Sequence, residues 1–264
     1  MMRGASADAY AAAAAALPGS GDLGTVAQDL FGVADLLRAE AGLRRVATDV
    51  SVPGEAKAGL VRDVLSGKVS DGALQVVTTA VSQRWTATRD LPDVLEQLGV
   101  VALVRSSGDD AGRLEDELFA VGQLVQGSPE LRQALSDPAR SRSDKTALVH
   151  GLLGDKVLPA TLALVGQALS GTHRTISVAL TEYQKVAAEV RNQGVATVHV
   201  ARPLSDADRE RLAASLSRTY GRQVHLNVVV DPSVIGGIRV EIGDDVIDGT
   251  VSSRLDDAGR RLAG

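Results

Sequence analysis

The length and composition of the chain indicate a globular protein of more than one domain and exclude several classes of function. The chain has 264 residues, 44% hydrophobic and 23% charged, and a domain usually takes roughly 100 to 200 residues. A formal net charge of -5 gives no long-range attraction for nucleic-acid phosphates or anionic lipid headgroups. The absence of cysteine excludes disulfides and thiolate metal ligands, in agreement with a reducing compartment. No apolar run approaches the roughly 20 residues that cross a bilayer, so membrane association is expected only through partners.

The chain opens with an alanine-rich segment, residues 9–17, which predicts a helix. An export signal would carry positive charge before its apolar stretch, whereas Asp8 stands at that place. Alanine is the best helix former. We therefore interpret the segment as a compact first helix with a flat face of small side chains.

An internal repeat is the most informative feature of the sequence. Residues 29–82 recur without a gap as residues 117–170, at an offset of 88 residues. Most shared residues are apolar and lie three and four positions apart, which is the spacing of a buried helical stripe. Examples are the identical pairs Leu30/Leu118, Phe31/Phe119, Val33/Val121, Leu60/Leu148, Val77/Val165 and Ala80/Ala168. The repeat predicts two similar arrays of helical hairpins, each with a break near Asp49 or Asp137.

The pattern of the sequence changes near Gly194. Residues 195–201 and 224–230 alternate or run apolar as strands do, and between them Ser205 is a good N-cap for a charged amphipathic helix that ends at Tyr220-Gly221. A third strand follows Gly236-Gly237, then comes a short strand or turn at 244–248, and a terminal helix is expected over 250–262. The predicted fold is mainly α, two similar helical bundles followed by a small α/β domain. The expected domains are residues 1–104, 105–193 and 194–264.

Motifs for catalysis or cofactor binding are absent or lack their structural context. The phosphate-binding pattern GxxxxGK[ST] and the nucleophile pattern GxSxG do not occur. Residues 19–24 fit GxGxxG, but they follow an alanine-rich helix and Pro18 where a dinucleotide site needs a strand. We interpret this segment as a flexible linker. No catalytic residue and no cofactor are predicted.

Metal ligands are not predicted either. The four histidines, His150, His173, His199 and His225, lie far apart and show no paired ligand spacing. The acidic residues at 244, 245 and 248 do not follow a calcium-loop pattern and are better explained by a turn.

The single tryptophan, Trp85, is expected in the core, with a partner interface as the alternative because tryptophan is favoured at binding hot spots.

The C-terminal sequence carries a family resemblance. Residues 230–255, VDPSVIGGIRVEIGDDVIDGTVSSRL, resemble the signature of the F-type ATP synthase delta subunit family, whose mitochondrial counterpart is the oligomycin-sensitivity-conferring protein. The matching features are an acidic residue, a double glycine, alternating aliphatic residues and an Asp-Gly turn. Its structural positions are Asp231, Gly236, Gly237, Asp248 and Gly249. The start of the chain, with Tyr10-Ala11, is similar to the opening helix of the same family.

The resemblance implies a non-catalytic stator subunit that links the catalytic F1 head to the peripheral stalk during proton-driven ATP synthesis. Its implied partners are the N-terminal helix of an alpha subunit and the b-type stalk subunits. Its implied location is the cytoplasmic face of the cell membrane, where it is held by those partners. The residues expected to contact the alpha-subunit helix are Tyr10, Ala11, Ala14, Val76, Val77, Ala80 and Val81.

Two alternatives and one departure from the family pattern accompany this interpretation. The chain could be a helical adaptor unrelated to the synthase, or an enzyme that uses the C-terminal α/β module. The family usually has one helical region before that module, whereas this chain has two similar copies and resembles the enlarged delta subunits of high-GC Gram-positive bacteria. Because Val76, Val77 and Ala80 have the counterparts Leu164, Val165 and Ala168, either copy could bind the head.

Overall fold

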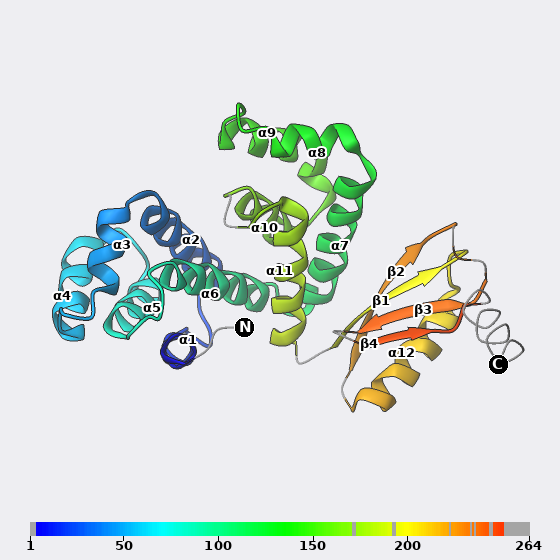
Figure 1. Cartoon of the computed structure of the whole chain (residues 1–264), viewed down its shortest axis with the longest axis horizontal. Coiled ribbons are helices and arrows are strands. Elements are labelled where there is room, and N and C mark those ends of the chain that lie inside the picture. Colours follow the sequence, from blue (N-terminus) through cyan, green and yellow to red (C-terminus); the bar gives the residue numbers. More distant parts are fainter. Residues whose placement is uncertain are drawn as a thin grey trace, which may run out of the picture. The chain divides into compact units, whose positions relative to one another are not determined.

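The chain folds into two compact units, Met1–Ala187 and Ala188–Gly264. The computed structural model (Figure 1) describes residues 4–170, 173–191, 194–221, 223–232, 234, 236–242 and 245–250. The first unit is helical and the second contains a sheet with one helix, so the predicted fold class is confirmed. The expected terminal helix lies almost wholly outside the described residues.

Helices and two short 3-10 turns make up the first unit. They are α1 (Ala5–Ala15), α2 (Leu23–Ala39), α3 (Ala41–Thr48), α4 (Gly54–Leu65), α5 (Asp71–Ser82), α6 (Asp90–Ser106), η1 (Gly108–Asp110), α7 (Ala111–Gly127), α8 (Pro129–Ser136), α9 (Arg142–Leu153), η2 (Gly154–Lys156), α10 (Pro159–Ala168) and α11 (Ile176–Val190).

The sequence repeat is a repeat of helices. At the offset of 88 residues, α2, α3 and α4 coincide with α7, α8 and α9 at both ends, and α5 coincides with the start of α10. The predicted breaks are also present, since Asp49 ends α3 and Asp137 ends α8. The two copies therefore share their local structure as well as their apolar stripes.

Side-chain caps explain where several helices begin. Asp22 accepts a hydrogen bond from the Thr25 amide at 3.0 Å, and Ser141 accepts one from the Asp144 amide at 3.1 Å. Such caps satisfy amides that have no partner inside the helix. Because of the Asp22 cap, Leu23 and Gly24 belong to α2. The linker expected over residues 19–24 is therefore shorter than predicted.

The core of the helical unit is centred on α6. This helix packs along α2, and its Leu91, Leu95 and Leu98 are fully buried together with Leu30 of α2. Trp85, in the segment before α6, is 6% exposed and donates from Nε1 to the Ala80 carbonyl at 3.0 Å. The expectation that Trp85 lies in the core is confirmed.

The second unit is a four-stranded mixed sheet with a helix. The strands are β1 (Gly194–Val200), β2 (Val224–Val230), β3 (Ile238–Ile242) and β4 (Asp245–Asp248), and α12 (Asp206–Tyr220) connects β1 to β2. The order is β2-β1-β3-β4, with β1 parallel to β2 and the other neighbours antiparallel. Alternate residues of β1 and β3 are buried with Leu216 of α12, as the period of two requires. Ser205 caps α12 as predicted.

Candidate partner-binding sites

The first helix presents an apolar surface that its own bundle covers only in part. In α1, Ser6, Ala9 and Ala13 are buried, whereas Ala11 is exposed and Tyr10 and Ala14 are half-buried. Asp8 is the single charged side chain of this helix. A surface helix usually has one apolar face and one polar face. An apolar face left open on a soluble bundle is typical of a contact surface.

Polar contacts fix α1 against the start of α6. Ser6 Oγ donates to Asp90 Oδ2 at 2.6 Å and accepts from the Thr86 amide at 2.9 Å. The same Asp90 oxygen accepts from the Ala87 amide at 3.2 Å. Because Ser6 is buried, these hydrogen bonds fix the position of α1 against α6 and also stabilise the bundle.

The seven residues expected to bind the alpha-subunit helix do not all reach the surface. Tyr10, Ala11 and Ala14 of α1 are at least partly accessible. The four on α5 are at most 1% exposed: Val76, Val77, Ala80 and Val81. Since α5 contacts α1, these four form the layer behind it. The accessible part of this site therefore belongs to α1.

A cluster of polar side chains joins the two helical copies. We call it the junction cluster: Asp35 and Arg38 of α2, Asp93 and Glu96 of α6, Arg142 of α9, Gln167 of α10 and Tyr183 of α11. At its centre Arg38 binds Glu96 at 2.6 Å and Asp93 at 3.1 Å. Asp35 pairs with Arg142 and accepts from Gln167 Nε2 at 3.4 Å.

The centre of the junction cluster is shielded from water. Glu96 is 2% exposed and accepts a hydrogen bond from the hydroxyl of Tyr183, which is 3% exposed. Burial raises the pKa of the Tyr183 phenol, and the neighbouring Glu96 charge raises it further. The tyrosine is therefore a neutral donor at any physiological pH. It ties α11 to the ion pair between α2 and α6.

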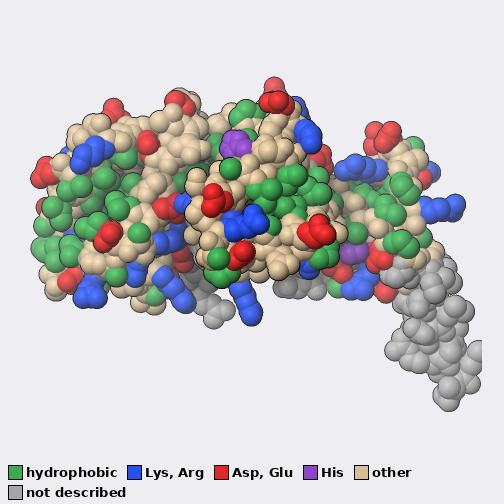
Figure 2. Space-filling model, turned by 90° about the horizontal axis from the view of Figure 1, so that it is seen from above, with side chains coloured by type: hydrophobic (Ala, Val, Ile, Leu, Met, Phe, Trp, Pro, Cys, Tyr) green, Lys and Arg blue, Asp and Glu red, His purple; other side chains and the backbone are tan. Residues whose placement is uncertain are grey.

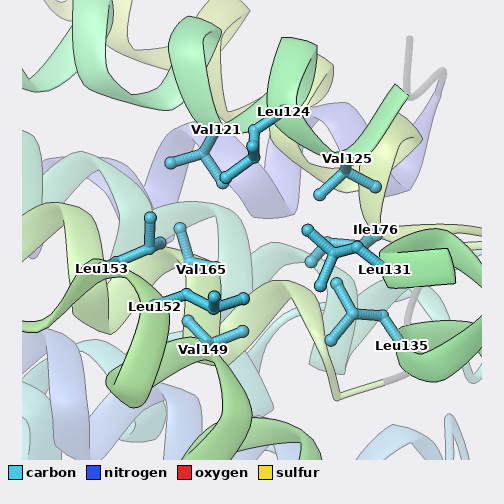
Figure 3. Close-up of a pocket in the computed structure, with 10 residues that line it drawn as sticks. All are labelled: Val121, Leu124, Val125, Leu131, Leu135, Val149, Leu152, Leu153, Val165 and Ile176. Atoms are coloured by element: carbon cyan, nitrogen blue, oxygen red, sulfur yellow. The ribbon is translucent and has the colours of Figure 1, made fainter. Parts of the chain in front are cut away.

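The second copy contains an apolar hollow. It is lined wholly by aliphatic side chains and is partly open to solvent (Figure 3). The lining residues are Val121, Leu124, Val125, Leu131, Leu135, Val149, Leu152, Leu153, Val165 and Ile176. Leu124 and Leu152 are 47% and 39% exposed, so the hollow reaches the surface.

The corresponding face of the first copy is also apolar at the surface. Leu36, Leu43, Leu60 and Val64, on α2, α3 and α4, are each more than 40% exposed. Figure 2 shows hydrophobic side chains on the surface of the helical part, between acidic and basic ones. Both copies thus offer apolar surface beyond α1.

The signature residues of the C-terminal unit build a tight backbone junction. Gly236 and Gly237 have φ angles of 66° and 84°, which favour glycine. A Cβ on Gly237 would lie 2.5 Å from the Gly249 carbonyl oxygen. Opposite this point the Gly249 amide donates to the Ile238 carbonyl at 2.9 Å. Gly237 is needed because two backbone segments meet there without room for a side chain, and glycine is favoured at Gly236 by its positive φ angle.

Asp231 and Asp248 complete this junction. The Asp231 amide donates to the Val200 carbonyl at 2.8 Å, which continues the pairing of β1 and β2. Asp248 Oδ1 accepts from both the amide and the hydroxyl of Thr250, at 2.9 Å and 2.7 Å. These bonds hold the pKa of Asp248 below its usual value, the hydroxyl contributing most. The contacts found at the signature are therefore structural.

Two searches of the described residues bear on other kinds of function. Within this part of the chain, no three His, Cys, Asp or Glu side chains come together as metal ligands would. None of its helices combines the length and apolarity needed to span a membrane.

Comparison with known proteins places the chain in a family. A sequence model of the family described as ATP synthase delta (OSCP) subunit matches residues 101–262, which include the second copy and the C-terminal unit. The ATP synthase subunit delta of Nocardioides sp. is 58% identical over 92% of this chain and 89% of its own length. The chain belongs to the ATP synthase delta (OSCP) subunit family. The resemblance to this family predicted from the C-terminal sequence is confirmed.

Other delta subunits also match both helical copies. The subunit delta of Streptomyces coelicolor is 43% identical over 99% of this chain and 98% of its own length, so that match spans both helical copies of this chain. In the cryo-EM structure of the Toxoplasma gondii mitochondrial ATP synthase hexamer, one matching chain is 22% identical. That match covers 62% of this chain and 95% of that chain with a TM-score of 0.36. The family model and the similar delta subunits support a delta-type stator subunit of an F-type ATP synthase and give no support to an unrelated adaptor.

Proposed function

We propose that this delta-family chain ties the catalytic head of a proton-driven ATP synthase to its peripheral stalk. Rotor torque would turn the head as well unless a stationary connector opposed it. Such a connector needs two binding surfaces and no reactive group. Membership of the delta family supports this function, and the open apolar face of α1 is the structural observation that carries it.

The alpha subunit of the head is the proposed partner of α1. Its N-terminal segment would bind as an amphipathic helix with the apolar side against Tyr10, Ala11 and Ala14. Alanine side chains let two helices approach closely, and helix-in-groove binding uses contacts three and four residues apart. The buried residues of α5 pack behind α1 and support its accessible apolar surface.

The b-type stalk subunits are the proposed partners of the C-terminal unit. Its edge strand β4 exposes Val246 and Ile247, at 56% and 46%. An edge strand with exposed apolar side chains is suited to adding a partner. With the head at one site and the stalk at the other, each contact raises the effective concentration for the other.

The proposed location is the cytoplasmic face of the cell membrane. The chain would reach the membrane only through the stalk, since its net charge of -5 does not favour anionic lipid or nucleic acid. ATP chemistry would take place on the head subunits, with no cofactor on this chain.

Calorimetry with the full chain tests the head site. A peptide of the N-terminal segment of the alpha subunit from the same organism should bind at micromolar concentration or better. Ala11→Glu should weaken binding at least about tenfold, because a carboxylate would be buried without a partner. Ala147→Glu, also at an exposed helical alanine, should bind like the wild type. No binding of the peptide to the wild-type chain would refute the proposed head contact.

A further inference from the structure

The helical repeat provides the second copy with its own counterpart of the α1 surface. At the offset of 88 residues, α1 corresponds to residues 93–103, which lie inside α6, and α5 corresponds to α10. In the first copy α1 contacts α5, and in the second copy α6 contacts α10. The helix that closes the first copy therefore also opens the second.

The two counterpart surfaces differ in exposure. Ala11 and Ala15 of α1 are exposed and Ala14 is half-buried. Their counterparts on α6 are all buried: Gly99, Ala102 and Leu103. The face that is open on α1 is therefore covered on α6.

The covering element is α2 of the first copy. A Cβ on Gly99 would lie 2.5 Å from the Phe31 ring, so α2 touches α6 at the position equivalent to Ala11. Arg38 binds Asp93 and Glu96 on α6. One turn earlier, Asp35 accepts from Gln167 on α10. Figure 1 shows α2 and α10 on the same side of α6. Helix α2 thus contacts both α6 and α10, the counterparts of α1 and α5.

We propose that α2 occupies the head-binding surface of the second copy from within the chain, so that one site, at α1, remains open. This inference rests on the proposed head contact and adds which copy makes it. In the second copy, α2 lies where the alpha-subunit helix would lie on the first copy. Helix α2 can fill this place because it is amphipathic, with Phe31, Ala34 and Arg38 on one side.

The internal contact also indicates the charge of the partner helix. The residue of α1 that corresponds to Glu96 is Asp8, which is exposed. Glu96 binds the guanidinium of Arg38 at 2.6 Å. By correspondence, the helix that binds α1 carries a Lys or Arg that pairs with Asp8, beside an apolar stripe. Asp8 is thus assigned as a specificity residue.

Native mass spectrometry of the full chain with excess alpha-subunit N-terminal peptide tests the number of sites. The expected result is one peptide per chain, reduced to none by Ala11→Glu and kept by Ala147→Glu. Two peptides per chain would overturn the closed second site while leaving the head contact intact. One peptide that persists in Ala11→Glu would place the open site elsewhere and would also overturn the inference. No peptide on the wild-type chain would refute the head contact itself.

A charge variant tests the partner chemistry. Asp8→Asn should lower the affinity for the peptide about two- to fivefold, as expected for an exposed ion pair. The difference in affinity between this variant and the wild type should shrink in high salt. Asp109→Asn, at an exposed acidic residue outside α1, is the control and should change nothing. Equal affinities of Asp8→Asn and wild type at low salt would contradict the assignment of Asp8.

Discussion

At Gly99, the ring of Phe31 on α2 leaves no room on α6 for a side chain. Gly99→Ala would place a methyl group against the buried ring of Phe31. Overpacking lowers the free energy of unfolding by about 1 to 3 kcal/mol, and the better helix propensity of alanine raises it by about 1 kcal/mol. We therefore expect a loss of about 1 kcal/mol in the free energy of unfolding, measured by urea denaturation.

A matched glycine provides the control for this prediction. Gly122 lies inside α7, and a Cβ there would meet nothing within 4 Å. Gly122→Ala should stabilise by up to about 1 kcal/mol. Two glycine variants with the same effect would show that the Phe31 contact is unimportant.

Glu96 is the buried centre of the junction cluster. Glu96→Gln removes the charge that faces Arg38 while keeping the shape of the side chain. Losing one partner of a buried ion pair leaves the other uncompensated. Because Arg38 is 21% exposed, we expect a moderate loss of about 2 kcal/mol in urea denaturation.

The control for Glu96 is an exposed ion pair of the same unit. Glu182 pairs with Lys185 at 2.8 Å, with side chains 46% and 59% exposed. Glu182→Gln should change stability by less than about 0.5 kcal/mol. A Glu96→Gln effect as small as this would mean that the junction cluster does not stabilise the fold.

Asp248 gives a prediction about pH. Its folded-state pKa lies below its usual value, mainly through the Thr250 hydroxyl. The group therefore adds stability above about pH 4, and this contribution is lost as the pH falls through the lowered pKa. In an NMR titration, Thr250→Val should raise the pKa of Asp248. The pKa of Asp208, lowered chiefly by Ser205, should stay unchanged. An unchanged Asp248 pKa would contradict the role of the hydroxyl.

Residues shared by the two copies could be predicted from the sequence, and residues of the junction could not. Leu30 and Leu118 are identical at the repeat offset and both are fully buried. Asp35 and Arg142, by contrast, align with Gln123 and Gly54. A repeat reveals what each copy needs for its own core. Contacts between the copies use the positions where they differ, so the comparison gave no signal for them.

Among the helices, α1 and α6 differ strongly in burial. Only Ser6, Ala9 and Ala13 of α1 are buried, whereas α6 is buried along most of its length from Leu91 to Val104. Amide exchange by mass spectrometry should be slowest in α6 and much faster in α1. The alpha-subunit peptide should slow exchange in α1 and leave α10 unchanged. Protection of α10 in place of α1 would contradict a closed second site.

The bounds of the helices followed from apolar periodicity and capping residues, with differences at segment ends. Residues 83–89 separate α5 from α6, because Gln83 is extended and ends α5. Trp85 then turns back onto the Ala80 carbonyl. Such a tertiary contact overrides local propensity and has no local signal. The first three strands of the second unit were predicted from alternating or apolar runs, whereas residues 244–248 were left as a short strand or turn and form β4.

The two units of the chain are proposed to bind different partners and to carry out no catalysis. The helical unit has an apolar helix face, which we propose binds the head, and the sheet unit has an edge strand, which we propose binds the stalk. The family signature at the C-terminus preserves a backbone junction, which keeps that unit folded. Whether the two helical copies act as separate domains, with boundaries at 104 and 193, stays a prediction.

We propose that this chain catalyses no reaction and holds the head stationary. This function is tested by ATP synthesis in inverted membrane vesicles from cells that lack the chain, driven by an imposed proton gradient. We expect ATP synthesis at background in these vesicles while the heads still hydrolyse ATP. Adding the purified wild-type chain should restore synthesis, and adding Ala11→Glu should not. Normal synthesis in vesicles without the chain would contradict the proposed function.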